Sequence, residues 1–182
     1  MSDIESMNLD GLHKRHPGLT QGVAQYYTEA AYVCLARHYQ SPVVFSVNHA
    51  GNGLCRIVNF LHPDERTRNA HANEIDATEA GAYGVSLAAV ESIIGMVAVR
   101  RAETLTGADW YITNNLNATQ DFERCVRLEV SGINAGSSRD VNRRLLEKIA
   151  QAASGRSNLP AIAAIVGFKV LEVAISPLEA QL

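Results

Sequence analysis

The segment 161–175 (AIAAIVGFKVLEVAI) constrains the fold more than any other part of the chain. It is almost entirely apolar and rich in the β-branched residues that favour strands. A strand with one face in water alternates apolar and polar side chains, and this segment does not. We therefore expect a single strand, Ala161–Ile175, at the centre of a sheet in an α/β protein.

The segments before this strand predict a regular order of elements. Asp76 and Glu79 fit a capping box that opens a helix ending at Ile94, and its many small residues let the helix axis lie close to a sheet. Three strand-like runs and a helix beginning at Ser137 or Ser138 follow: Met96–Ala102, Asp109–Thr113, Arg124–Ser131 and the helix to Ala153. Residues 76–175 therefore read αβββαβ.

The first 75 residues predict a helix and a β-hairpin that are added to this core. Thr20 can cap a helix that runs to about Gln40. Strands at Val43–Asn48 and Leu54–Leu61 form a hairpin, with Asn52-Gly53 supplying the positive φ angles of the turn. Pro63 begins a short polar helix. No repeat or linker divides the chain, so we expect one domain over residues 1–182, with the core at 76–175.

Composition narrows the class of protein further. The chain has 182 residues, 47% of them apolar and 19% charged, which is typical of a globular protein. No apolar run reaches the roughly 18 residues of a membrane span, and the acidic N-terminus does not resemble a signal peptide. The three cysteines, Cys34, Cys55 and Cys125, lie in apolar runs, so we expect buried thiols and a cytoplasmic location.

The net charge of −3 conceals an uneven distribution. Residues 124–169 hold eight Lys/Arg and only three Asp/Glu. Four of these cations lie on the predicted helix after the third strand: Arg139, Arg143, Arg144 and Lys148. Such a cluster can contact the phosphate backbone of a nucleic acid. The alternative is a solvated helix face, because Asp140 and Glu147 are interspersed.

Few residues offer catalytic chemistry, since the common phosphate-binding, metalloprotease and hydrolase motifs do not occur. His13 and His16 form either a ligand pair or two solvated side chains. The stronger candidates are Asp109 and Glu129, which lie on neighbouring predicted strands. Two carboxylates that converge there can bind Mg²⁺, which prefers oxygen ligands. The bound ion can activate water and stabilise charge on a phosphate.

The αβββαβ order, the run Thr106–Tyr111 and the run Leu128–Ser131 together resemble the PD-(D/E)xK superfamily of nucleases. The resemblance covers residues 76–175. It implies a restriction-endonuclease-like fold with a central mixed four-stranded sheet. It also implies Mg²⁺ or Mn²⁺ as cofactor, Asp109 and Glu129 as its ligands, and Glu79 as a supporting carboxylate.

Ser131 departs from this pattern, because the family has a lysine at that catalytic position. Serine carries no positive charge. Four cations could take over the role: Arg127 on the same strand face, Arg100 or Arg101 on the first strand, or Lys148 on the following helix. Without such a replacement the site would bind its ligand and not cleave it.

Each candidate also has a purely structural interpretation. Glu79 fits the third position of the capping box, and Asp109 can terminate the turn at Gly107. Glu129 lies in an apolar strand and can form a salt bridge to one of the arginines. Three aromatic residues can stack on bases or pack in the core: Tyr83, Trp110 and Tyr111.

The sequence thus predicts a metal-dependent phosphodiesterase that acts on DNA. An alternative is a catalytically degenerate nuclease-like module that binds nucleic acid or protein as a subunit of a defence or DNA-processing complex. A third possibility is a structural protein, in which the apolar last strand lies at a sheet edge and forms a homodimer. We expect no membrane partner.

Overall fold

The computed structural model describes residues 4–103, 106–114, 124–153 and 158–177. Its elements are one 3-10 helix, four α-helices and seven strands: η1 Leu12–Lys14, α1 Gln21–Ala36, β1 Val43–His49, β2 Asn52–Val58, α2 Glu65–Ala70, α3 Glu74–Ile94, β3 Val97–Arg101, β4 Trp110–Thr113, β5 Val126–Ile133, α4 Ser138–Ala153, β6 Ala161–Gly167 and β7 Glu172–Ile175. No described helix is both long and apolar enough to cross a membrane.

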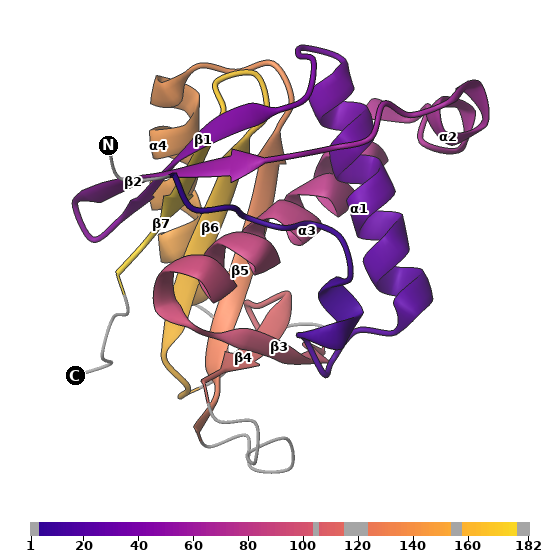
Figure 1. The fold of residues 1–182 in the computed structure, drawn as a ribbon. Helices are drawn as coiled ribbons and strands as arrows, with labels where there is room; N and C mark the ends of the chain where they lie inside the picture. The colour runs from indigo at the N-terminus through magenta and orange to yellow at the C-terminus, as the bar shows by residue number, and fades with distance from the viewer. Residues whose placement is uncertain (1–3, 104–105, 115–123, 154–157, 178–182) are drawn as a thin grey trace.

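The strands form one mixed sheet in the order β2-β1-β7-β6-β5-β4-β3 (Figure 1). Two neighbouring pairs, β1–β7 and β5–β6, are parallel, and the other four are antiparallel. Helices cover both faces. Leu128 and Val130 of β5 face the main core with α1 and α3, while Val141 of α4 packs on Ile165 of β6 from the other side. The predicted α/β class is confirmed, with a sheet larger than expected.

The apolar segment 161–175 forms two strands rather than one. β6 and β7 pair antiparallel, with Gly167 opposite Glu172. The turn between them places Leu171 at a φ of 51°, a conformation that leucine rarely adopts. The prediction of one long strand is therefore wrong, whereas its placement inside the sheet is confirmed. Because the last strand is not at an edge, the arrangement expected for dimerisation through it does not occur.

Close packing of α3 depends on glycine. A Cβ on Gly81 would lie 2.9 Å from the backbone of Ala31 in α1. A Cβ on Gly132 of β5 would lie 2.5 Å from the carbonyl oxygen of Thr78 in α3. The small residues of α3 were expected to let it approach the sheet. In the structure, Gly81 of α3 instead allows the close contact with α1. The close approach of the sheet to α3 depends on Gly132, which lies on β5.

Three local predictions are wrong in detail. The N-cap of α3 is Asn73, whose side chain accepts hydrogen bonds from Ile75 and Asp76, so no capping box begins at Asp76. The predicted hairpin forms, but its turn is Ala50-Gly51, both at positive φ, and Asn52-Gly53 lies in β2. Cys34 and Cys125 are buried as expected, whereas Cys55 is exposed because it lies opposite the exposed Ser46 on an uncovered face.

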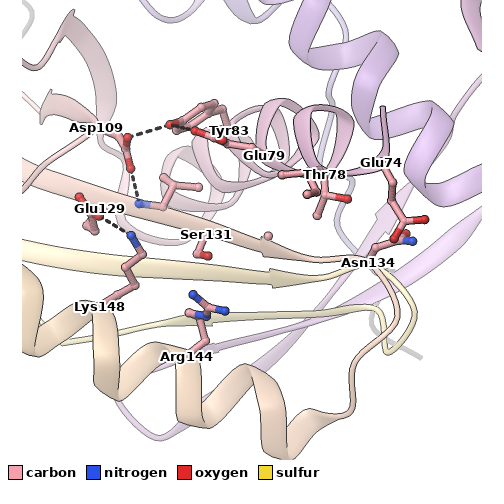
Figure 2. A pocket seen from close by; sticks show the side chains of 13 residues that line it. Glu74, Thr78, Glu79, Tyr83, Asp109, Glu129, Ser131, Asn134, Arg144 and Lys148 are labelled. Atoms are coloured by element: carbon pink, nitrogen blue, oxygen red, sulfur yellow. Dashed lines mark hydrogen bonds and ion pairs between the residues drawn. The ribbon is translucent and has the colours of Figure 1, made fainter. Parts of the chain in front are cut away.

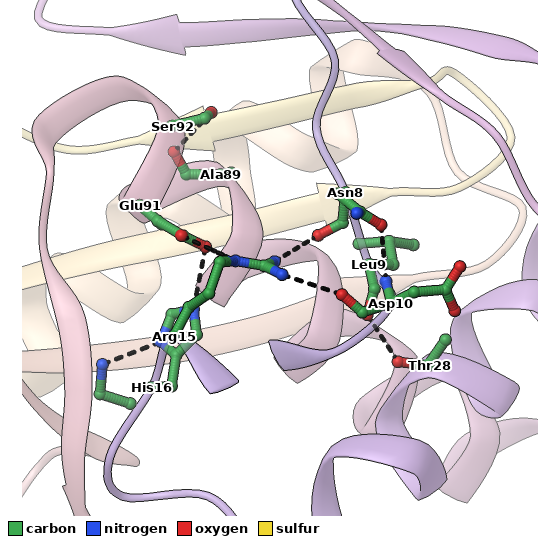
Figure 3. A network of polar contacts seen from close by, with 10 residues as sticks. Asn8, Leu9, Asp10, Arg15, His16, Thr28, Ala89, Glu91 and Ser92 are labelled. Atoms are coloured by element: carbon green, nitrogen blue, oxygen red, sulfur yellow. Dashed lines mark hydrogen bonds and ion pairs between the residues drawn. The ribbon is translucent and has the colours of Figure 1, made fainter. Parts of the chain in front are cut away.

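The N-terminal segment ties the ends of the sheet to the helices. Near its start, the Met7 amide donates to the carbonyl of Ile57 in β2. Further along, Arg15 donates from Nε to both oxygens of Glu91 in α3, at 2.8 and 2.9 Å (Figure 3). His16 is fully buried, accepts from the Ala98 amide of β3 at Nδ1 and contacts Glu91 through Nε2. Both ring nitrogens of His16 are thus engaged, so His13 and His16 are neither a ligand pair nor two solvated side chains.

Candidate active site

A cavity of about 430 Å³ opens between α3 and α4 along β5 (Figure 2). The sheet explains its position, because β4 pairs with β5 only at Val126–Leu128. Beyond that point no described strand covers this side of β5. The cavity contains every candidate catalytic residue together with two cations of α4, its polar lining being Glu74, Thr78, Glu79, Tyr83, Asp109, Glu129, Ser131, Asn134, Arg144 and Lys148.

Asp109 lies just before β4, at the point where the pairing with β5 ends. Its Oδ2 accepts a hydrogen bond from the Val130 amide at 2.8 Å, so the side chain continues the ladder by one bond. Its Oδ1 accepts from the Tyr83 hydroxyl at 2.7 Å and lies 3.4 Å from Nη2 of Arg101. In the described contacts the side chain of Asp109 thus extends the pairing with β5 rather than terminating the turn at Gly107, and it also lines the cavity.

Glu129 is a buried carboxylate with only 4% of its surface exposed. Its Oε1 accepts from Nζ of Lys148 at 2.6 Å and from the amide of Gln151 at 3.0 Å, and both partners belong to α4. Burial raises the pKa of Glu129, an effect that the hydrogen bond from Lys148 opposes and the charge of Asp109 reinforces. The expected salt bridge exists, but its cation is Lys148 and not an arginine.

Of the other cations proposed to replace the missing lysine, Arg100 and Arg127 point elsewhere, whereas Arg101 forms an ion pair with Asp109 at 3.4 Å. Arg127 donates to the carbonyl oxygens of Leu159 and Thr106, and Arg100 pairs with Glu103. The guanidinium of Arg101 lies 4.4 Å from the centre of the Tyr83 ring and donates to its hydroxyl. Lys148 is the one of the four that contacts Glu129 within the described chain.

Glu79 lies well inside α3, because the helix begins at Glu74. Its predicted capping role is therefore wrong. Its carboxylate accepts from the Tyr83 hydroxyl at 3.0 Å, one helical turn further along. Ser131, where the family has its lysine, also lines the cavity.

The basic helix divides into two parts. Lys148 and Arg144 line the cavity, whereas Arg143 is exposed and pairs with Asp140 at 2.9 Å. Arg139 is exposed in the first turn of α4. Arg144 also pairs with Glu147 at 3.4 Å, so the interspersed acids neutralise both arginines as the solvated-face interpretation expects.

The three aromatic residues are buried and pack in the protein rather than presenting open faces to bases. Tyr83, Trp110 and Tyr111 are each less than one-tenth exposed. Trp110 packs edge-on against Tyr27 of α1. Tyr83 and Trp110 therefore pack in the main core, although the hydroxyl of Tyr83 also reaches the cavity. Tyr111 is buried outside that core, and its hydroxyl donates to Glu103.

Three polar residues that line the cavity were not predicted: Glu74, Thr78 and Asn134. The sequence also did not predict the contact of Gln151 with Glu129 or that of the Tyr83 hydroxyl with Asp109. Tyr83 and Gln151 each follow a candidate at helical spacing, since Tyr83 is four residues after Glu79 and Gln151 is three after Lys148. That spacing was the available signal, but sequence alone does not say which helix face meets the carboxylates.

Asp109 and Glu129 offer oxygen donors suited to Mg²⁺ or Mn²⁺. Among the described residues no group of three or more His, Cys, Asp or Glu could hold a metal. Mg²⁺ does not need one, because it is commonly held by one or two carboxylates, with waters and substrate phosphates completing its shell. In the described contacts Oε2 of Glu129 receives no hydrogen bond, so this oxygen is available to an ion.

Comparisons with models of known families, with curated proteins and with solved structures found no match.

Proposed function

We propose that this cavity is the active site of a metal-dependent phosphodiesterase that acts on DNA, of the PD-(D/E)xK kind. The observation that carries the proposal is the 2.6 Å contact between Lys148 and Glu129 in the cavity that also holds Asp109. Two acids and a lysine are the charged groups that this chemistry requires. Here Lys148 of α4 supplies the cation that Ser131 lacks.

The arrangement of elements supports the same proposal. In chain order α3, β3, β4, β5, α4 and β6 follow the αβββαβ pattern, and the four strands are neighbours in the sheet. β3, β4 and β5 are successively antiparallel, and β6 is parallel to β5. We propose that these elements form a restriction-endonuclease-like core, to which residues 1–75 and β7 are additions.

Each residue of the cavity then has a role. Asp109 and Glu129 would hold Mg²⁺ or Mn²⁺, and the bound ion would activate water and stabilise charge on the scissile phosphate. Lys148 holds Glu129 in place and presents a positive charge beside it. Arg144, one turn earlier on the same helix, also lines the cavity and would contact a neighbouring phosphate of the DNA strand.

Cleavage assays with variants of Glu129 and Lys148 test the proposal. We expect the wild-type protein to degrade DNA with Mg²⁺ or Mn²⁺ and to be inactive with a chelator. Glu129→Ala and Lys148→Met should each abolish cleavage, while Glu65→Ala, an exposed carboxylate on α2, should retain it. Metal-dependent cleavage that survives Glu129→Ala would contradict the assignment.

A second function, a degenerate module that binds without cutting, is favoured by one observation. Lys148 and Gln151 both occupy Oε1 of Glu129, so the protein itself neutralises the charge that an ion would otherwise balance. Such a module would bind nucleic acid or a protein within a defence or DNA-processing complex. Calorimetry with Mn²⁺ separates the two functions, because only the first requires the ion to bind.

A further inference from the structure

Tyr83 joins two of the candidate carboxylates through one hydroxyl group. This oxygen lies 2.7 Å from Oδ1 of Asp109 and 3.0 Å from Oε1 of Glu79 (Figure 2). It also accepts a hydrogen bond from Nη2 of Arg101 at 2.9 Å. The side chain is only 6% exposed. The ring is also held by the guanidinium of Arg101, 4.4 Å from its centre. Tyr83 is therefore a fixed donor.

The hydroxyl restrains the orientation of Asp109. One carboxylate oxygen is held by the Val130 amide at 2.8 Å and the other by Tyr83 at 2.7 Å. Without the hydroxyl, the described contact left to Oδ1 is the long one of 3.4 Å to Arg101. Rotation of the carboxylate would then be opposed by the Val130 bond alone, and the geometry offered to an ion would be less defined.

Glu79 reaches Asp109 only through Tyr83 in the described contacts. A phenol has one hydrogen to donate, and the shorter of its two carboxylate contacts is to Asp109. Glu79 and Asp109 therefore compete for the same hydrogen. Glu79 can influence the orientation of Asp109 in this way without contacting a metal.

We propose that Tyr83 is the positioning residue that orients Asp109 for a divalent cation, and that Glu79 acts on the site through Tyr83 rather than as a ligand. This inference rests on the proposed function, since it presupposes that Asp109 binds the ion. It changes the role that the family resemblance implies for Glu79 and adds a residue that the family motif does not contain.

Calorimetric titration with Mn²⁺ tests the inference without any need for cleavage. We expect Tyr83→Phe, which removes only the hydroxyl, to weaken Mn²⁺ binding by roughly 10–100-fold, as loss of a group that orients a metal ligand commonly does. Tyr32→Phe is the matched control, because Tyr32 is also a buried helical tyrosine but lies outside the cavity. It should bind Mn²⁺ like the wild type. Thermal melting confirms that each variant folds.

A double-mutant cycle then separates the two roles of Glu79. If Glu79 acts through Tyr83, Glu79→Ala changes Mn²⁺ affinity in the wild type and has no further effect in Tyr83→Phe. Equal losses in both backgrounds would show that Glu79 is a direct ligand and would overturn this part.

Unchanged affinity in Tyr83→Phe would overturn the inference and leave the proposed function standing. Absence of Mn²⁺ binding by the wild type would reject the proposed function itself, and the inference with it.

Discussion

Replacing Lys148 with methionine is expected to destabilise the fold in a strongly pH-dependent way. Methionine retains much of the apolar length of lysine and removes the charge. Glu129 then loses the contact at 2.6 Å and keeps only the bond from Gln151 at 3.0 Å. Because Glu129 is almost fully buried, water cannot replace the lost partner.

The size of the loss follows from the burial of the pair. Removing one partner of a buried ion pair costs about 3–5 kcal/mol of folding free energy. The Lys148 side chain is 18% exposed and Gln151 remains, so we expect the lower end of that range, about 3 kcal/mol. For a domain of this size that corresponds to a fall in Tm of roughly 6–12 °C.

The pKa of Glu129 determines the sign of the pH dependence. Burial already raises this pKa above its ordinary value of 4.5, and Lys148 opposes the shift, so the variant raises the pKa further. A carboxyl whose pKa is higher in the folded state favours folding most at pH values below 4.5, and that contribution is lost as pH rises through the folded pKa. The variant should therefore resemble the wild type near pH 4 and show its full deficit near pH 8.

Urea denaturation at both pH values measures this difference, with the double variant Glu129→Gln/Lys148→Met as control. The double variant has no buried charge at this position, so it should recover most of the stability at pH 8. A deficit of equal size at pH 4 and pH 8 would refute the reasoning. A double variant as unstable as the single one at pH 8 would refute it as well.

Two further substitutions test the packing and capping of α3. Gly132→Ala should lower the free energy of unfolding, measured by urea denaturation, by about 1–3 kcal/mol, because its Cβ would lie 2.5 Å from the Thr78 carbonyl oxygen. Gly22→Ala is the control and should be neutral or stabilising, because a Cβ there has no atom within 4 Å. Equal effects of the two substitutions would contradict the close approach of β5 to α3. Asn73→Ala should lower the free energy of unfolding by about 1 kcal/mol as the loss of an N-cap. Asp76→Ala should cost clearly less, and the reverse order would restore the capping box predicted from the sequence.

The fold class could be read from the chain because helices and strands depend on local periodicity. The helix that closes at Gly95, the strand that contains Glu129 and the hairpin after Pro42 all form near their predicted positions. The predicted ends of elements were wrong where two residues of similar preference lie close together, or where no residue preference marks a turn. Asn73 and Asp76 are both good N-caps, and Leu171 adopts a turn conformation that no residue preference announces.

Part of the candidate site was predictable, because it depends on strands that follow each other in the chain. Asp109 and Glu129 lie on consecutive strands, and such strands are usually neighbours in a sheet, so their approach could be expected. The choice among Arg100, Arg101, Arg127 and Lys148 could not be made in this way. Side-chain alternation along a strand put Arg127 on the same face as Glu129, yet the Arg127 side chain donates to the carbonyl oxygens of Thr106 and Leu159.

By itself, the sequence therefore determined the α/β class, the order of elements from α3 to α4 and the two carboxylates as the leading candidates. Only the tertiary structure decided that 161–175 divides into two interior strands, that Lys148 is the cation beside Glu129, and that Tyr83 links Glu79 to Asp109. The physical reason is the distance along the chain over which each interaction acts. Backbone conformation follows neighbours a few residues apart, whereas the partner of a buried charge depends on how helices pack across a sheet.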